Sequence, residues 1–233
     1  MVDIQLRGEL WDNDSADVLR WWGFRDITAP MDIQAALDAA AGDDVTLLIN
    51  SPGGDMAVGN EIRSMLRRYS GDTTALFQGM GASAATLAAS GCRVIQSEPG
   101  ALLCYHNPMG HANGDFREMQ RSANGLEAAR DGILEVYLSR PGVKASREEL
   151  VELMDRDTWI NPSRALGYGL IDGIVGTDGE IADPAAFVAA AGHRIRLTET
   201  MRHRYQDHLA EERKQRDEAV RRALAKARAL TNF

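Results

Sequence analysis

The chain has 233 residues, of which 44% are hydrophobic and 26% charged, and its formal net charge is −8. These values are ordinary for a globular protein with one sizeable core, and the acidic balance argues against nucleic-acid binding by the chain as a whole. No signal peptide opens the sequence, and no apolar run approaches the ~20 residues that span a bilayer. We therefore expect a soluble protein that is not exported by a cleaved signal and does not bind membranes.

The two cysteines, Cys92 and Cys104, do not have the spacing of metal ligands. In a chain of this size they indicate buried thiols in a reducing compartment, although pairing of the two stays open. We expect neither a metal nor a cofactor.

Strands and helices alternate through residues 43–175, which predicts an α/β architecture with parallel pairing. Val2–Leu10 alternates polar and apolar residues, as in a half-buried strand, whereas Val45–Ile49 is typical of a strand buried on both faces of a sheet. Apolar residues recur at helical spacing from Asp115 to Arg140 and predict the longest helix of the first 200 residues. Other strands are expected at 73–78, 93–96, 101–105 and 170–175, and other helices from Asp14, Thr28, Met56, Ala84, Ser146 and Asn161.

The composition changes after Ala190, because residues 199–233 hold nine Lys and Arg against six Asp and Glu. The apolar stripe in this segment is thin, which predicts a protruding or partly disordered helix. We therefore divide the chain into a domain over residues 1–190 and a charged helical tail over residues 191–233.

Ser83 stands where a predicted strand becomes a helix, in the sequence Gly79-Met80-Gly81-Ala82-Ser83-Ala84. Small residues let the backbone turn sharply, and a helix N-terminus leaves unpaired N–H groups that can stabilise an oxyanion. This placement favours a nucleophile. A serine before a helix is more often a cap, however, so this stretch alone does not decide its role.

A serine hydrolase also needs a general base and an acid that orients the base. His106 ends a predicted strand and is the candidate base, with His111 in the following loop as the weaker alternative. His193, His203 and His208 fall in or near the charged tail. The candidate acids are Asp155, Asp157 and Asp172, and the pattern does not choose among them.

Candidate backbone N–H donors for an oxyanion are Gly53-Gly54, which follow a buried strand, and Ala84, which follows the serine. The alternative for the two glycines is an ordinary Pro-Gly turn. The serine also departs from the Gly-x-Ser-x-Gly elbow of α/β-hydrolases, since Ala85 stands at the second glycine position.

Short blocks of sequence follow one another in a recognisable order. They are Ile49–Gly54, Gly79–Ala84, His106–Pro108, Arg156–Trp159 and Ala165–Asp172. In order and approximate spacing these blocks resemble the Clp serine peptidases, and the likeness runs from about residue 43 to 176.

The resemblance implies a triad of Ser83, His106 and Asp157, with Gly54 and Ala84 lining the oxyanion hole. It implies the crotonase-like ββα superhelix of that family. The predicted helix at 115–140 would then be its protruding handle helix, used in contact between rings.

The first 42 residues look little like the standard Clp proteolytic subunit, and the tail after residue 190 is additional. Such ends resemble the head maturation (prohead) proteases of tailed phages and prophages. This branch implies a cytoplasmic serine endopeptidase, in a bacterium or a phage-infected host, that assembles as a homo-oligomeric ring. Its substrates would be capsid or scaffold proteins, cleaved without an ATPase partner.

Three other functions stay open. One is a general Clp protease subunit that works with an ATP-driven unfoldase. Another is a crotonase-type acyl-CoA enzyme, which shares the fold and needs no serine nucleophile. The third is a non-catalytic assembly protein whose tail binds a partner.

Overall fold

The computed structural model of the chain describes residues 1–176 and 196–230. Its described residues fall into two units, one with residues 1–13 and 26–176 and the other with residues 14–25 and 196–230. The predicted domain boundary at residue 190 and His193 lie outside the described residues.

One mostly parallel sheet runs through the larger unit. Its strands are β1 (Val2–Leu10), β2 (Ile27–Thr28), β3 (Val45–Gly54), β4 (Thr73–Ala82), β5 (Val94–Ser97), β6 (Leu102–Tyr105), β7 (Thr158–Ile160) and β8 (Gly173–Ile174). The order is β2-β1-β3-β4-β5-β8, and β6 pairs with both β4 and β7. Only the pairing of β6 with β7 is antiparallel among the described strands. The predicted α/β architecture with parallel pairing is therefore confirmed.

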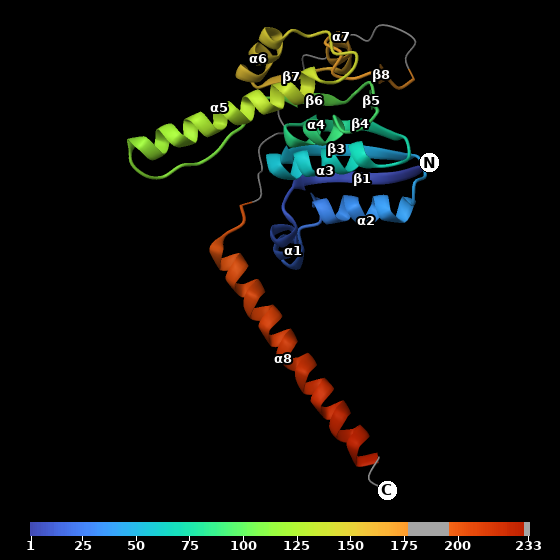
Figure 1. Ribbon diagram of the computed structural model, residues 1–233, viewed down its shortest axis with the longest axis vertical. Helices are drawn as coiled ribbons and strands as arrows, with labels where there is room; N and C mark the ends of the chain where they lie inside the picture. Colours follow the sequence, from blue (N-terminus) through green and yellow to red (C-terminus); the bar gives the residue numbers. More distant parts are fainter. Residues whose placement is uncertain (177–195, 231–233) are drawn as a thin grey trace. The chain divides into compact units, whose positions relative to one another are not determined.

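The helices begin close to the predicted positions. They are α1 (Asn13–Trp21), α2 (Pro30–Ala40), α3 (Met56–Arg68), α4 (Ala84–Ala89), α5 (Phe116–Leu138), α6 (Arg147–Asp155), α7 (Pro162–Gly167) and α8 (Glu199–Leu230). Side chains fix several of these starts, since Asp55 accepts hydrogen bonds at the start of α3 and Asp115 does so at the start of α5. The long helix α5 extends beyond the edge of the sheet (Figure 1).

Helices α2, α3 and α4 pack on one face of the sheet and on one another. Leu47, Ile49 and Phe77 point to that face and are almost completely buried. Leu48 and Leu76 alternate with them and are only half-buried. The prediction that Val45–Ile49 is buried on both faces holds at Thr46, which is 8% exposed, and fails at Leu48, which is half-buried.

Strands β3 and β4 are longer than predicted, because their glycine-rich ends still pair through the backbone. Gly54 lies opposite Leu10 of β1, and Ser51 lies opposite Gly81 of β4. The carboxyl ends of β3 and β4 therefore bring the Gly53-Gly54 segment beside the start of α4.

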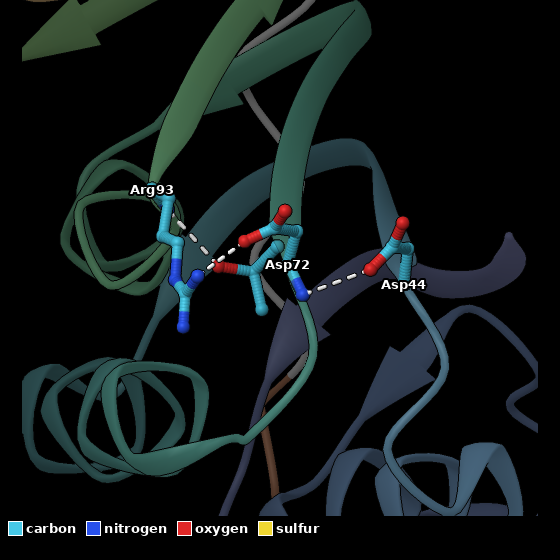
Figure 2. A network of polar contacts seen from close by, with 4 residues as sticks. Asp44, Asp72 and Arg93 are labelled. Atoms are coloured by element: carbon cyan, nitrogen blue, oxygen red, sulfur yellow. Dashed lines mark hydrogen bonds and ion pairs between the residues drawn. The ribbon is translucent and has the colours of Figure 1, made fainter.

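A polar network joins the opposite edge of the sheet, where β3, β4 and β5 begin (Figure 2). The backbone N–H of Asp72 donates to Asp44 Oδ1 at 3.1 Å, and the Asp72 carboxylate pairs with the Arg93 guanidinium. The Arg93 backbone N–H in turn donates to Thr73 Oγ1 at 3.0 Å. The Arg93–Asp72 pair is exposed and adds little stability by itself, so the network serves mainly to hold the strand starts together.

The smaller unit joins α1 to α8 through the densest aromatic cluster of the chain. The Trp21 ring lies 5.8 Å from Tyr205 and 5.1 Å from His208, centroid to centroid. Trp22 Nε1 donates to the carbonyl of Met201 at 3.3 Å. Glu199–Leu230 form the helix α8, and every side chain from Ala210 to Arg221 is exposed.

Cys92 and Cys104 are free and buried, so the alternative of a disulfide between them is excluded. Burial is the largest cause that raises the pKa of each thiol to about 12. Within the described residues, no helix combines the length and apolarity needed to cross a membrane.

Candidate active site

Ser83 is the single residue between β4 and α4, and its backbone is strained. Its φ of 55° and ψ of −126° lie in a region that non-glycine residues rarely adopt. The Ser83 N–H donates to the carbonyl of Cys104 at 3.0 Å. The Ser83 carbonyl accepts from the Thr86 N–H and the Thr86 hydroxyl at 2.9 and 2.6 Å. Backbone and side-chain bonds therefore hold the turn on both sides.

The Ser83 side chain does not cap α4, although the residue occupies the N-cap position. From Gly81 to Cys92 every residue except Ser83 is buried, and Ser83 itself is half-buried. The ordinary capping role is therefore absent, and the hydroxyl is left accessible.

Gly53 packs directly against the Ser83 turn. A Cβ atom at Gly53 would lie 2.5 Å from the Ala82 carbonyl oxygen and 2.7 Å from Ser83 Cβ, and φ is +87°. The Gly53 N–H donates to Ser51 Oγ, and the Asp55 N–H donates to the Leu10 carbonyl. The N–H groups on both sides of Gly54 are thus occupied, and Gly54 itself is exposed.

Replacing Gly53 with alanine should destabilise the protein by about 2 kcal/mol or more, since the new Cβ collides with backbone atoms at a positive φ. Gly132→Ala is the matched control, because no atom lies within 4 Å of its added Cβ. In the middle of α5 this change should stabilise the protein by up to about 1 kcal/mol. Urea unfolding measures both; equal midpoints for the two variants would contradict the close approach at Gly53.

His106 follows β6, which pairs with β4 so that Ala82 lies opposite Cys104. The His106 Nδ1 atom is 2.6 Å from the carbonyl oxygen of Asn107. Because a carbonyl oxygen can only accept, Nδ1 carries the proton in this contact, and in the neutral ring Nε2 is then the unprotonated nitrogen. This is the tautomer that a general base needs.

Asp157 directly precedes β7, a strand that the sequence did not predict. In the antiparallel pairing of β6 with β7, Cys104 lies opposite Trp159 and Tyr105 opposite Thr158. His106 and Asp157 are the next residues beyond this pairing, so β6 and β7 bring their two chain segments close together. Asp157 is exposed, and its φ of 46° is positive. In the described residues its carboxylate makes no hydrogen bond.

The other two candidate acids have partners elsewhere. Asp155 Oδ1 accepts from Asn107 Nδ2 at 2.8 Å. Asp172 Oδ2 accepts from the Ile95 N–H and from Arg140 Nη2, both at 2.7 Å.

The alternative base His111 is exposed in the loop before α5 and does not line the cavity described below. His203 and His208 lie on α8, where they face Asp207 and Glu212. In the described residues no group of His, Cys, Asp and Glu side chains is arranged to hold a metal ion.

A cavity of about 280 Å³ has Gly54, Ser83, Ala84 and His106 in its lining, while Asp157 is not part of that lining. Four of the five predicted site residues therefore line one cavity, and the fifth, Asp157, lies in the segment that precedes β7. Apolar and aromatic side chains make up most of the remaining wall, and Asp55 and Asn107 add polar groups to it. The apolar and aromatic members are Met56, Leu87, Pro108, Met109, Leu126, Ala129, Ile133 and Tyr137.

Sequence reasoning missed the contribution of α5 to this cavity. The helical spacing of Leu126, Ile133 and Tyr137 predicts a helix, and in the structure these three side chains line the cavity together with Ser83. The sequence offers no further signal for this role than the apolar spacing itself.

A comparison with protein families matches residues 29–178 to the family described as Clp protease. The chain belongs to the Clp protease family. The match includes all five predicted site residues and excludes the whole of the smaller unit.

Relatives of this Clp protease family member are named ATP-dependent Clp protease proteolytic subunits. Those of Nephroselmis olivacea and Mesostigma viride are 31% and 33% identical to it over 130 and 129 residues. The aligned part is 55% and 54% of this chain but only 62% and 56% of those relatives. Subunit 1 of Chlamydia abortus is 29% identical over 170 residues, 70% of this chain and 81% of the relative.

Proposed function

We propose that this chain is a serine peptidase in which Ser83 is the nucleophile, His106 the general base and Asp157 the acid that orients it. The observation that carries the proposal is the strained, uncapped Ser83 in the wall of a cavity that His106 also lines. Strain at a non-glycine residue persists where the surrounding structure enforces it, and it is common at functional sites.

In the proposed reaction, His106 Nε2 takes the proton of the Ser83 hydroxyl as its oxygen attacks the peptide carbonyl carbon. The N–H groups of Gly54 and Ala84 bind the resulting oxyanion. Ala84 is the first residue of α4, so its N–H has no acceptor within the helix. The imidazolium then donates its proton to the leaving amine, and water hydrolyses the acyl-enzyme by the same steps.

The Nδ1–H of His106 has two acceptors at different stages of this reaction. At rest it points to the Asn107 carbonyl oxygen. Asp157, which precedes the β7 strand that pairs with β6, supplies the negative charge that stabilises the imidazolium once it forms. The neutral carbonyl thus keeps the tautomer, and the carboxylate acts when the ring is charged.

The cavity walls favour an apolar side chain on the acyl side of the cleaved bond. Fluorogenic peptides that differ only at this residue test the activity and the preference together. Leu or Met should be cleaved about tenfold faster than Asp, because the cavity removes apolar surface from water and its lining includes the like-charged Asp55. Absence of any cleavage, or faster cleavage after Asp, would contradict the proposal.

A ring of identical subunits is part of the same proposal, with the crotonase-like ββα superhelix in each subunit and α5 as the handle. Phe116 and Met119, near the start of α5, are 77% and 42% exposed, which suits a contact with a second copy. Native mass spectrometry measures this, and a monomer at every protein concentration would contradict it.

Maturation of phage capsid or scaffold proteins is the narrower role that we propose. Its support is the family match, which leaves out residues 1–28 and all of α8. A capsid–scaffold precursor should then be cleaved without any ATPase. The alternative, a general Clp proteolytic subunit, would degrade unfolded protein only when an ATP-driven unfoldase is added.

A further inference from the structure

Thr86 fixes the direction of the Ser83 carbonyl. It is the third residue of α4 and is 3% exposed. Both its N–H and its hydroxyl donate to the Ser83 carbonyl oxygen, at 2.9 and 2.6 Å. A capping serine would instead use its own hydroxyl oxygen to accept from the N–H at this position. The Thr86 N–H is therefore already bonded to the Ser83 carbonyl oxygen. It does not attract the Ser83 hydroxyl away from the cavity.

Tyr137 of α5 completes a chain of hydroxyl groups. Its hydroxyl oxygen lies 2.7 Å from Thr86 Oγ1, and the side chain is 5% exposed. Because the single hydroxyl proton of Thr86 goes to the Ser83 carbonyl, Tyr137 must be the donor to Thr86. Burial raises the pKa of Tyr137 and keeps this donor protonated. Hydrogen bonds in such a chain strengthen one another.

The ring of Tyr137 connects the same chain to the base. It packs edge-on against Tyr105, with centroids 5.3 Å apart and an interplanar angle of 77°. Tyr105 directly precedes His106, and the Tyr137 ring also lines the cavity. One side chain from α5 thus contacts the segments that carry both Ser83 and His106.

We propose that Tyr137 and Thr86 are positioning residues that hold Ser83 in its uncapped conformation through the chain Tyr137 O–H to Thr86 O–H to the Ser83 carbonyl. The inference rests on the proposed role of Ser83 as nucleophile. It adds two residues to the site that touch neither the substrate peptide bond nor the reacting oxygen.

The experiment measures the rate constant for fluorophosphonate labelling of Ser83, together with kcat, KM and thermal stability. Thr86→Val and Tyr137→Phe keep the side-chain shapes and remove the hydroxyls. Both should label about tenfold more slowly and lose kcat in proportion, as expected for a lost buried hydrogen bond. KM should stay within about twofold, because the cavity walls are unchanged. Thr86→Ser restores the hydroxyl and should restore the rate.

Tyr69→Phe is the structural control, because the Tyr69 hydroxyl bonds Gly42 N–H and the Asp43 carbonyl, near the opposite edge of the sheet. It should lower thermal stability and leave labelling unchanged. The proposed chain of hydroxyl groups alone would be overturned if folded Tyr137→Phe and Thr86→Val label at the wild-type rate while Ser83→Ala is inactive. Both this chain and the proposed function would be overturned if the wild-type protein is not labelled at Ser83.

Discussion

Replacing Ser83 with alanine should abolish fluorophosphonate labelling and lower kcat for peptide cleavage by about 10⁴-fold or more, since no acyl-enzyme can form. The fold should be unaffected, because the Ser83 side chain makes no capping bond and the bonds that hold the turn come from its backbone. Mass spectrometry of the labelled protein identifies the modified residue, and fluorogenic peptide cleavage measures the rate.

Ser122→Ala is the control for this change, because Ser122 is exposed on α5 and is absent from the cavity lining. It should label and cleave as the wild type does. Undiminished cleavage by Ser83→Ala would rule out the assignment. Saturable binding of a CoA thioester without peptide cleavage would favour an acyl-CoA enzyme. A folded wild type that is not labelled, cleaves no peptide and binds no CoA thioester would favour an assembly protein.

The change Asp157→Asn should lower kcat by about 10²-fold to 10⁴-fold while KM stays nearly constant, because the amide cannot stabilise the imidazolium by charge. Asp157 is exposed, so solvent screening favours the lower end of that range. Its thermal stability should stay close to that of the wild type, since no hydrogen bond of this carboxylate is lost among the described residues. Steady-state kinetics and thermal unfolding separate the two effects.

The matched variant Asp172→Asn should lose stability and keep its activity. Asp172 accepts from Arg140, whose side chain is 9% exposed, and from the Ile95 N–H, so the change weakens a partly buried ion pair. We expect a loss of about 1–2 kcal/mol of stability and wild-type kcat per folded molecule. An inactive Asp172→Asn beside an active Asp157→Asn would mean that the acid is assigned to the wrong residue.

Much of the candidate site could be predicted from local sequence. Ser83 and His106 follow strands whose carboxyl ends meet at one edge of a parallel sheet, so that chemistry-bearing residues at those ends gather there. The glycines before α3 also carried a clear signal, because only glycine tolerates the contact between Gly53 and Ala82. These features depend on residues that are neighbours along the chain or in adjacent strands.

The choice of acid and the role of α5 could not be predicted in this way. Asp157 precedes β7, a three-residue strand that is too short to leave a periodic pattern, so the pattern did not separate it from Asp155 and Asp172. Tyr137 shows the same helical spacing whether it fills a core or lines a cavity, and its hydroxyl acquires a function only from Thr86, 51 positions away along the chain.

By itself the sequence determined the parallel α/β architecture, the turn that carries Ser83 and the family blocks, because each depends on short-range periodicity and on small residues at sharp turns. The tertiary structure alone decided whether Ser83 caps its helix or presents its hydroxyl. That outcome depends on whether the Ser83 carbonyl or the Ser83 hydroxyl accepts the hydrogen bond from the Thr86 N–H. It also depends on Tyr137 of α5, which hydrogen-bonds the Thr86 hydroxyl. Only packing brings those groups together.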